Sequence, residues 1–395
     1  MASLRRVRFE DALQVMRSHA VSLPAEPVPL EELAGRILAV EVRARVDHPA
    51  FTNSQMDGYA VRSADASGGT PQRLVGESRA GAPFDGEVGP GEAIRISTGA
   101  EFPTGVDAIL RKEDAEEADG AVTALDPPAA GLFVRRVGED VRRGEVLLEA
   151  GHVVAPHEVA VAAAAGHAEV ACWRRPRVAV LGSGDEVVAP GGTLRSGQVF
   201  DANRPGVAAQ ARAAGAEMVS STLVRDDREA TIAAVREALD AAGQAPDVMI
   251  TIGGISVGPH DHLRPALEEA GVAEILFGVR IRPGSPLWLG RRGERIVLGL
   301  PGNPVSAAVC FHAFGRPLLG RADSWDRLMP LSADYAKDTP RTELIRCREE
   351  GGALMPLPRQ GSHAITSLAG ATHLAVIPAE AERVPAGQQV RCSPL

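Results

Sequence analysis

Three short glycine-bearing turns follow apolar stretches in the second half of this 395-residue chain. They read "LGSGDEVV", "TIGGISVGPHD" and "GLPGNPVSAA", and each has serine, asparagine or a carboxylate beside its glycines. Glycine lets the backbone approach a ligand closely, and backbone amides that follow a strand can face an anion. One glycine at a strand end is usually only a turn. Three such turns together predict a site for a phosphate-bearing ligand.

Carboxylates occur at the same strand ends. Asp185 and Glu186 follow the first turn's glycines, Asp226 and Asp227 follow another apolar stretch, and Asp261 ends the second turn. Carboxylates beside an anion site are expected where Mg²⁺ bridges them to phosphate oxygens. The alternative is structural, because Asp227 and Asp261 each precede a predicted helix and Asp185 lies in a turn, where Asp commonly caps.

A second group of polar residues lies earlier in the chain. Asp57 occurs in "FTNSQMDGYAV", Thr98 in "RISTGAEFPTG", and Arg135 and Asp140 in "FVRRVGEDVRRGE". From the residues alone, "MDGYA" is a buried turn and the arginine-rich segment is a solvated hairpin. His260 has no partner of His or Cys type at metal-ligand spacing, so we interpret it as solvated or facing an anion.

The pattern of elements changes along the chain. Strand, loop and helix alternate four times over 176–322, which predicts a doubly wound parallel sheet whose ligands bind beyond the carboxyl ends of the strands. Short strands separated by turn signals predict a small β-rich module over 48–140 and a β barrel over 323–395. The remaining residues, 1–47 and 141–175, are assigned to an N-terminal helix and a linker region.

Composition excludes several classes of protein. The formal net charge of -9 argues against a nucleic-acid binder, which requires a basic face. The four cysteines form no CxxC pair, which favours reduced, scattered thiols. No apolar run is long enough to span a membrane, and the first twenty residues form an amphipathic helix pattern with Phe9, Ala12, Leu13 and Met16 on one face. We therefore expect a soluble cytoplasmic protein without nucleic-acid or membrane partners.

Six motifs, taken together and in this order, resemble one family. They are "NSQMDGYAV", "STGAEFPTGVDAIL", "VRRVGEDVRRGE", "GSGDEVV", "GGISVGPHD" and "GLPGNPVSA". Their order is similar to that of the MoeA family, the molybdopterin molybdenumtransferases, which are related to the E domain of gephyrin. The resemblance covers nearly the whole chain.

The resemblance implies a multidomain protein of α/β and β parts. A MogA-like doubly wound α/β domain would bind molybdopterin, beside an inserted β-rich module, an elongated linker region and a C-terminal β barrel. The implied reaction inserts molybdenum from molybdate into adenylylated molybdopterin and releases AMP, with Mg²⁺ as cofactor. The implied assembly is a homodimer whose cleft lies between the α/β domain of one subunit and the inserted module of the other, and other molybdenum cofactor biosynthesis proteins are expected partners.

The resemblance also implies roles for individual residues. Catalytic roles fall to Asp57, Thr98, Asp140, Glu186, Asp226 and Asp261. The implied metal ligands are Glu186, Asp226 and Asp261. The implied substrate-binding residues are Arg135, Gly253, Gly254, Ser256, Arg282, Ser285, Pro301, Gly302, Asn303 and Pro304.

Two departures from the family pattern keep other functions open. Where relatives often have Lys-Pro-Gly-Lys-Pro, this chain has Arg282 and Ser285 around its Pro-Gly, so one cation is retained and one is lost. His363 and Ala364 stand where relatives often have glycine and an acidic residue. The alternatives are a binding scaffold with reduced catalysis, a tungstate-inserting homologue, and the preceding adenylyltransferase step.

Overall fold

The fold is described from a computed structural model of the chain. It describes residues 3–67, 69–241, 243, 245–255, 262–321, 325–337 and 339–395. The chain divides into two compact units, each described by itself. Unit 1 comprises Met1–Pro24 and Arg174–Leu395, and unit 2 comprises Ala25–Trp173.

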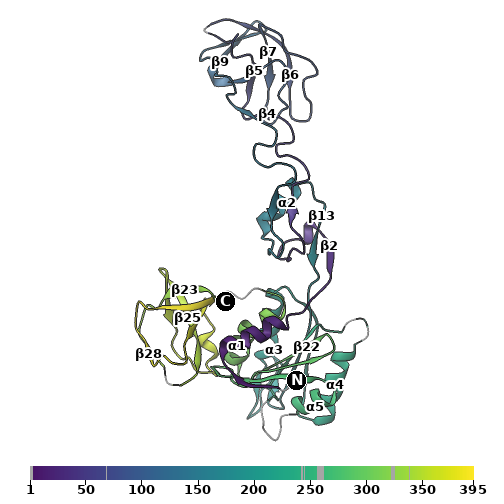
Figure 1. Ribbon diagram of the computed structural model, residues 1–395, viewed down its shortest axis with the longest axis vertical. Helices are drawn as coiled ribbons and strands as arrows, with labels where there is room; N and C mark the ends of the chain where they lie inside the picture. The colour runs from purple at the N-terminus through teal and green to yellow at the C-terminus, as the bar shows by residue number, and fades with distance from the viewer. Residues whose placement is uncertain are drawn as a thin grey trace. The chain divides into compact units, whose positions relative to one another are not determined.

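A seven-stranded sheet forms the centre of unit 1 (Figure 1). Six of its strands run in the same direction. Among the described strands of this sheet, only β21 runs antiparallel to both of its neighbours. Its order is β1 (Leu4–Val7), β19 (Ala273–Val279), β21 (Trp288–Arg292), β22 (Arg295–Leu300), β18 (Val248–Ile252), β14 (Arg177–Ser183) and β17 (Glu217–Val224).

Helices cover both faces of this sheet, as a doubly wound fold requires. One apolar core joins strand residues such as Val180 and Ile250 to the first group of helices, and a second core joins Leu181 and Met249 to the other. Adjacent residues of one strand therefore point to opposite faces. The first group is α1 (Phe9–Ser18), α3 (Asn203–Ala213), α6 (Pro304–Cys310), the π-helical η4 (Phe311–Gly315) and α7 (Arg316–Leu318). The second is α4 (Arg228–Asp240) and α5 (Leu263–Glu269), which lie side by side in Figure 1.

The N-terminal segment Met1–Pro24 belongs to the same compact unit as the central sheet. Strand β1 pairs in parallel with β19 and lengthens the sheet. The predicted apolar face of α1 is confirmed, because Phe9, Ala12, Leu13 and Met16 are buried. Phe9 makes edge-to-face contacts with Phe314 and Trp325, at centroid distances of 5.9 and 5.3 Å. The sequence did not reveal this because the partners lie about 300 residues away.

The C-terminal segment of unit 1 forms a six-stranded sheet. Its core contains Ile345, Leu354, Ala375 and Val390. The path is β20 (Ile281–Arg282), β25 (Thr342–Glu350), β27 (His373–Ile377), β29 (Gln389–Pro394) and β23 (Arg327–Pro330), with β26 (Ala353–Pro356) paired to β25. Small additional pairs are β24 (Tyr335–Ala336) with β28 (Arg383–Val384), and β15 (Val187–Val188) with β16 (Val199–Phe200). A 3₁₀ turn, η5, spans Ile365–Ser367.

Unit 2 contains the β-rich module. Its six-stranded sheet has the order β8 (Ala108–Arg111), β5 (Gly58–Val61), β7 (Glu92–Ile96), β6 (Gln72–Ser78), β10 (Ala121–Ala124) and β9 (Ala115–Ala118). Two-stranded pairs are β4 (Asn53–Ser54) with β11 (Val134–Arg135), β3 (Val42–Arg43) with β12 (Val146–Leu148), and β2 (Ala25–Pro29) with β13 (Glu169–Trp173). The helical pieces are η1 (Leu30–Glu32), η2 (Lys112–Asp114), η3 (Pro156–Glu158) and α2 (Val159–Ala164).

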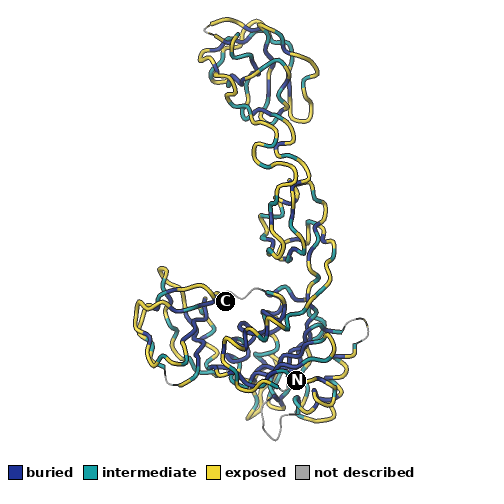
Figure 2. The backbone as a smooth tube through the Cα atoms, viewed as in Figure 1, coloured by how far each residue is buried: buried dark blue, intermediate teal, exposed yellow. Residues whose placement is uncertain are grey.

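Burial follows the apolar strands, which form the dark cores of the tube in Figure 2. All four cysteines are buried and free, as the absence of paired spacing predicted. Within the described ranges, no helix combines the length and apolar composition needed to cross a bilayer.

One buried histidine makes unit 1 sensitive to acid. His312 lies in η4, its Nδ1 accepts from Arg316 Nη1 at 3.3 Å, and its Nε2 therefore carries the proton donated to Ser393 Oγ at 2.8 Å. Burial, with the charge of Arg316, lowers the pKa of His312 to about 3. Because the unfolded chain takes up this proton near pH 6.5, stability is full above that pH and is lost as pH falls toward 3.

We expect acidification from pH 7 to pH 5 to lower the stability of unit 1 by about 2 kcal/mol through His312 alone. The measurement is urea unfolding followed by fluorescence of Trp288 and Trp325, which are both buried in unit 1. A His312→Asn variant serves as the comparison, because asparagine does not titrate in this range. Equal pH slopes for the two proteins would contradict the assignment.

Candidate active site

The three glycine-bearing turns meet at one edge of the central sheet. Strands β14, β18 and β22 are neighbours and parallel, so their carboxyl ends lie together. The Gly253 N–H donates to Leu300 O at 3.1 Å, and a Cβ added to Gly302 would lie 3.6 Å from Gly253 Cα. Gly253 and Gly254 both adopt positive φ, 82° and 57°, which glycine tolerates best. The turns are thus close enough to contact one ligand.

A pocket of about 340 Å³ opens between the first and third turns. Four predicted site residues line it: Glu186, Gly302, Asn303 and Pro304. Its wall also contains Ser183, Asp201, Asn203 and Arg204, which the sequence had not indicated as site residues. Ser183 lies inside the "LGSGDEVV" motif, so its place beside the glycines was the available signal.

Asn203 provides an open acceptor at the start of α3. Its Nδ2 donates to Gly302 O at 2.6 Å, which ties α3 to the third turn. Its Oδ1 is buried and makes no hydrogen bond within the described part of the chain. One carboxylate oxygen of Asp201 already accepts hydrogen bonds from the N–H groups of Asn203 and Arg204. The first amides of α3 are therefore not available to an anion.

Carboxylates lie beside this pocket, at the ends of β14 and β17. The Asp185 N–H donates to Asp226 Oδ2 at 3.4 Å, and the Asp226 N–H donates to Asp185 Oδ1 at 3.3 Å. Glu186 is exposed and lines the pocket. Asp227 has the structural role instead, since it accepts from the Ala230 N–H at 2.8 Å and caps α4. Carboxylate oxygens are the ligands that Mg²⁺ prefers, so the side-chain types at these strand ends match that ion.

The structure tests the predicted metal ligands only in part. Among the residues it describes, no three His, Cys, Asp or Glu side chains are grouped closely enough to hold a metal. Two predicted site residues, Ser256 and Asp261, lie outside the described residues. Their roles stay predictions.

Arg282 is the last residue of β20, and Ser285 lies in the turn that follows this strand. Arg282 Nη1 lies 3.3 Å from Glu343 Oε1, on the neighbouring strand β25. Glu343 is almost fully buried, and its other oxygen accepts from the Tyr335 hydroxyl at 2.7 Å. The Ser285 carbonyl accepts from the N–H groups of Val279 and Leu287, both at 2.9 Å. The C-terminal sheet therefore fixes this turn, and neither residue lines the pocket described above.

Unit 2 contains the other predicted residues. The Asp57 carboxylate accepts from the Thr98 N–H at 2.7 Å and from Thr98 Oγ1 at 3.1 Å. These two hydrogen bonds hold the pKa of Asp57 below its usual value. Arg135 and Asp140 have exposed side chains further along the chain. The structure thus joins Asp57 to Thr98 and leaves the charges of Asp57, Arg135 and Asp140 exposed to solvent.

Family models match three successive parts of the chain. The MoeA N-terminal region, domains I and II, matches residues 7–166. A probable molybdopterin binding domain matches 179–321, and the MoeA C-terminal region, domain IV, matches 329–395. A molybdopterin molybdenumtransferase of Haemophilus influenzae is 35% identical over 382 residues, which cover 93% of each chain. The chain belongs to the MoeA family.

Other MoeA-family proteins agree in length and fold. The molybdopterin molybdenumtransferase of Synechococcus elongatus is 34% identical over 97% of this chain and 98% of its own. A crystal structure of a molybdopterin biosynthesis MoeA protein from Pyrococcus horikoshii superposes with a TM-score of 0.82 at 30% identity, covering 98% of this chain and 99% of that one. The expected MoeA-like multidomain fold is thereby confirmed. The pocket lies inside the segment that matches the probable molybdopterin binding domain.

Proposed function

We propose that this protein is a molybdopterin molybdenumtransferase that inserts molybdenum from molybdate into adenylylated molybdopterin and releases AMP. The observation that carries the proposal is the pocket formed by the turns after β14 and β22, within the segment matched by a probable molybdopterin binding domain. Its curated relatives over nearly the full length bear the same enzyme name.

The turns of unit 1 would hold the pterin and phosphate part of the substrate. Gly253 and Gly254 would allow the backbone close to the ligand, and Asn203 offers an acceptor for a ring N–H. We also assign Ser256 to this part of the substrate. The rigid prolines of "LPGNP" hold Gly302 and Asn303 at the pocket wall. Arg282 and Ser285 would hold the molybdate oxyanion, with the guanidinium oriented by Glu343.

The carboxylates would hold Mg²⁺ and orient the reacting groups. We assign Glu186, Asp226 and Asp261 to the metal, which supplies positive charge where the pyrophosphate bond breaks. Asp57, Thr98, Arg135 and Asp140 would complete the site from unit 2 of a second subunit in a homodimer. We place the enzyme in the cytoplasm, where it would receive its substrate from other molybdenum cofactor biosynthesis proteins.

A direct assay tests this function. Purified protein is supplied with adenylylated molybdopterin, molybdate and Mg²⁺, and AMP is measured together with molybdenum bound to the pterin. We expect molybdate-dependent AMP release, a fall of about 100-fold after EDTA treatment, and recovery with added Mg²⁺. Substrate binding without turnover would indicate a scaffold instead, and turnover with tungstate but not molybdate would indicate the tungstate-inserting alternative.

A further inference from the structure

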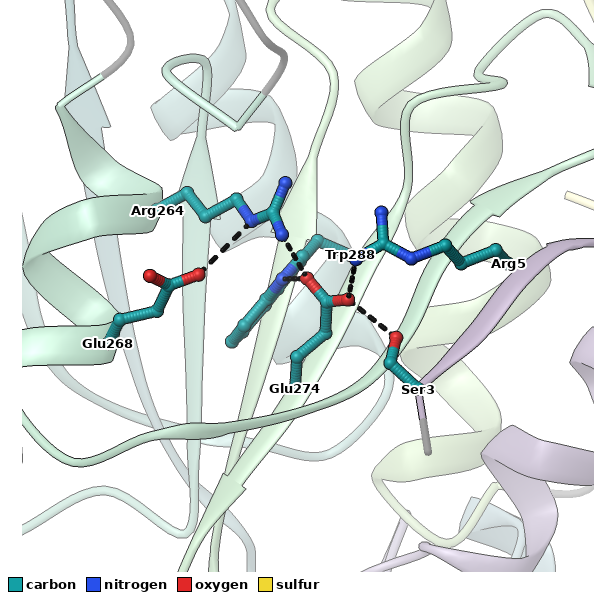
Figure 3. Close-up of polar contacts among 6 residues, drawn as sticks. All are labelled: Ser3, Arg5, Arg264, Glu268, Glu274 and Trp288. Atoms are coloured by element: carbon teal, nitrogen blue, oxygen red, sulfur yellow. Dashed lines mark hydrogen bonds and ion pairs between the residues drawn. The ribbon is translucent and has the colours of Figure 1, made fainter. Parts of the chain in front are cut away.

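A largely buried carboxylate on β19 is held by four donors from three parts of the chain: the β1 segment, α5 and β21. Glu274 Oε1 accepts from Ser3 Oγ at 2.5 Å and from Arg5 Nη2 at 3.2 Å (Figure 3). Glu274 Oε2 accepts from Trp288 Nε1 and pairs with Arg264 Nη2, both at 2.9 Å. Only 10% of the Glu274 side chain is exposed. Two donors on each oxygen fix the carboxylate in position and orientation.

One donor leads from Glu274 directly to the second glycine-bearing turn. Arg264 is the second residue of α5, and its guanidinium lies 4.9 Å from the centre of the Phe277 ring. Its backbone N–H donates to Gly254 O at 3.4 Å. A guanidinium that is both paired and stacked has little freedom. Glu274 therefore fixes the side chain of Arg264, and the backbone N–H of Arg264 in turn holds the carbonyl of Gly254.

A second route runs through the core. Trp288 is fully buried on β21, next to β22. A Cβ added to Gly299 would lie 3.0 Å from both Trp288 Cβ and Ile255 Cγ2, so these two side chains meet over Gly299. Ile255 directly follows Gly254. The hydrogen bond from Trp288 to Glu274 thus fixes a side chain that shares a core cluster with Ile255 at the end of the turn.

We infer that Glu274 is a positioning residue for the Gly253–Gly254 turn and so controls affinity for the molybdopterin substrate. This rests on the proposed function, in which that turn binds the pterin and phosphate part of the substrate. Glu274 has no place in the pocket wall and acts through Arg264 and Trp288. If the turn samples other conformations, only a fraction of the molecules can bind the substrate. The apparent Kd then equals the intrinsic Kd divided by that fraction. The chemical step, carried out elsewhere, stays unchanged.

The test is Glu274→Gln in the full-length enzyme. The substitution keeps the shape of the side chain but replaces one carboxylate oxygen by an NH₂ group. That oxygen accepted hydrogen bonds from two donors, whereas the NH₂ group is itself a donor and can accept from neither. We expect KM for adenylylated molybdopterin to rise about 10-fold, with kcat and KM for molybdate within about twofold of wild type. Arg264→Lys retains the charge without the planar fork and should give an intermediate KM.

Glu268→Gln is the matched control. Glu268 is the other carboxylate paired with Arg264, at 3.4 Å, but its side chain is 57% exposed. An exposed ion pair contributes little, so we expect KM for both substrates to equal that of wild type. If Glu274→Gln also leaves KM for the pterin unchanged, the inference is wrong. It is equally overturned if kcat and both KM values change together with the melting temperature, because that pattern indicates general destabilisation.

Hydrogen exchange separates this inference from the proposed function. Glu274→Gln should speed exchange of the Gly253 and Arg264 amides about 10-fold relative to Glu268→Gln, since these amides donate to Leu300 O and Gly254 O within the turn. If the wild-type enzyme is inactive, the proposed function is refuted. The exchange measurement then still decides whether Glu274 positions the Gly253–Gly254 turn. Equal exchange in the two variants would show that Glu274 does not position the turn.

Discussion

Replacing Asp57 by asparagine is expected to lower molybdenumtransferase turnover about 100-fold without changing the fold of unit 2. Asparagine retains an oxygen for the Thr98 N–H and hydroxyl, so the hydrogen bonds of the carboxylate can persist. Only the negative charge is lost, and the Thr98 hydrogen bonds, which lower the pKa of Asp57, favour that charged form. Turnover is measured as molybdate-dependent AMP release, with circular dichroism to check the fold.

Asp119→Asn provides the matched control. Asp119 lies in the turn between β9 and β10 of the same sheet, with positive φ, where asparagine is well tolerated. Its turnover should equal that of wild type. A similar loss in both variants would mean that charge anywhere on unit 2 affects the assay, and wild-type turnover in Asp57→Asn would remove Asp57 from the site.

Mixing two variants of reduced turnover tests the proposed homodimer. Asp57→Asn disables the unit 2 part of a site, and Glu186→Gln disables the unit 1 part. If each site combines unit 1 of one subunit with unit 2 of the other, a mixed dimer has one intact site and one doubly altered site. Equal mixing with subunit exchange should then restore about a quarter of wild-type turnover. No restoration after confirmed exchange would argue for a site built within one subunit.

Gly284→Ala is expected to destabilise unit 1 by about 4 kcal/mol, through a clash and through backbone strain. Gly284 lies in the turn between Arg282 and Ser285 with φ of +98°. An added Cβ would lie 2.1 Å from the Sγ of Cys310, which is fully buried on α6 and cannot move aside. The measurement is the urea midpoint of unit 1, followed by the fluorescence of its buried tryptophans.

Two further variants separate the clash from the strain. Gly293 also has positive φ, +59°, but nothing lies within 4 Å of an added Cβ, so Gly293→Ala should lower stability by only about 1 kcal/mol. Adding Cys310→Ala to Gly284→Ala removes the clashing sulfur, and the pair should be less destabilised than the sum of the two single variants by about 2 kcal/mol. Strict additivity would contradict the steric explanation.

Local patterns in the sequence were sufficient where the structure depends on near neighbours. The helical period identified the buried face of α1 around Phe9 and Met16. The position of Asp227 before a helix raised capping as the alternative to a functional role, and the structure shows the cap. The alternation of strands and helices predicted the central sheet and the shared edge of its glycine-bearing turns. In each case the signal itself is local, a helical period, a residue before a helix or a repeated strand–helix unit, although the groups that pack together are distant in sequence.

Features that depend on distant pairing could not be predicted in the same way. No local signal links β1 to β19, or Arg282 to the buried Glu343, because each pair meets only in the folded sheets. The hydrogen bond from the Asn203 amide to Gly302 O joins residues about 100 positions apart and likewise has no local signal. The antiparallel β21 also has no signature, since buried strands are equally apolar in either direction.

The interruption of unit 1 by unit 2 has a consequence for synthesis of the chain. Residues 1–24 leave the ribosome first, yet α1 packs against Phe314 and Trp325, and β1 pairs with β19. At about 5–20 residues per second, the apolar face of α1 remains without these partners for roughly 15–60 seconds. Unit 2, which is continuous in sequence, is complete during that interval. The nascent chain therefore carries an exposed amphipathic helix ahead of an already complete module, a state in which a chaperone would find a binding segment.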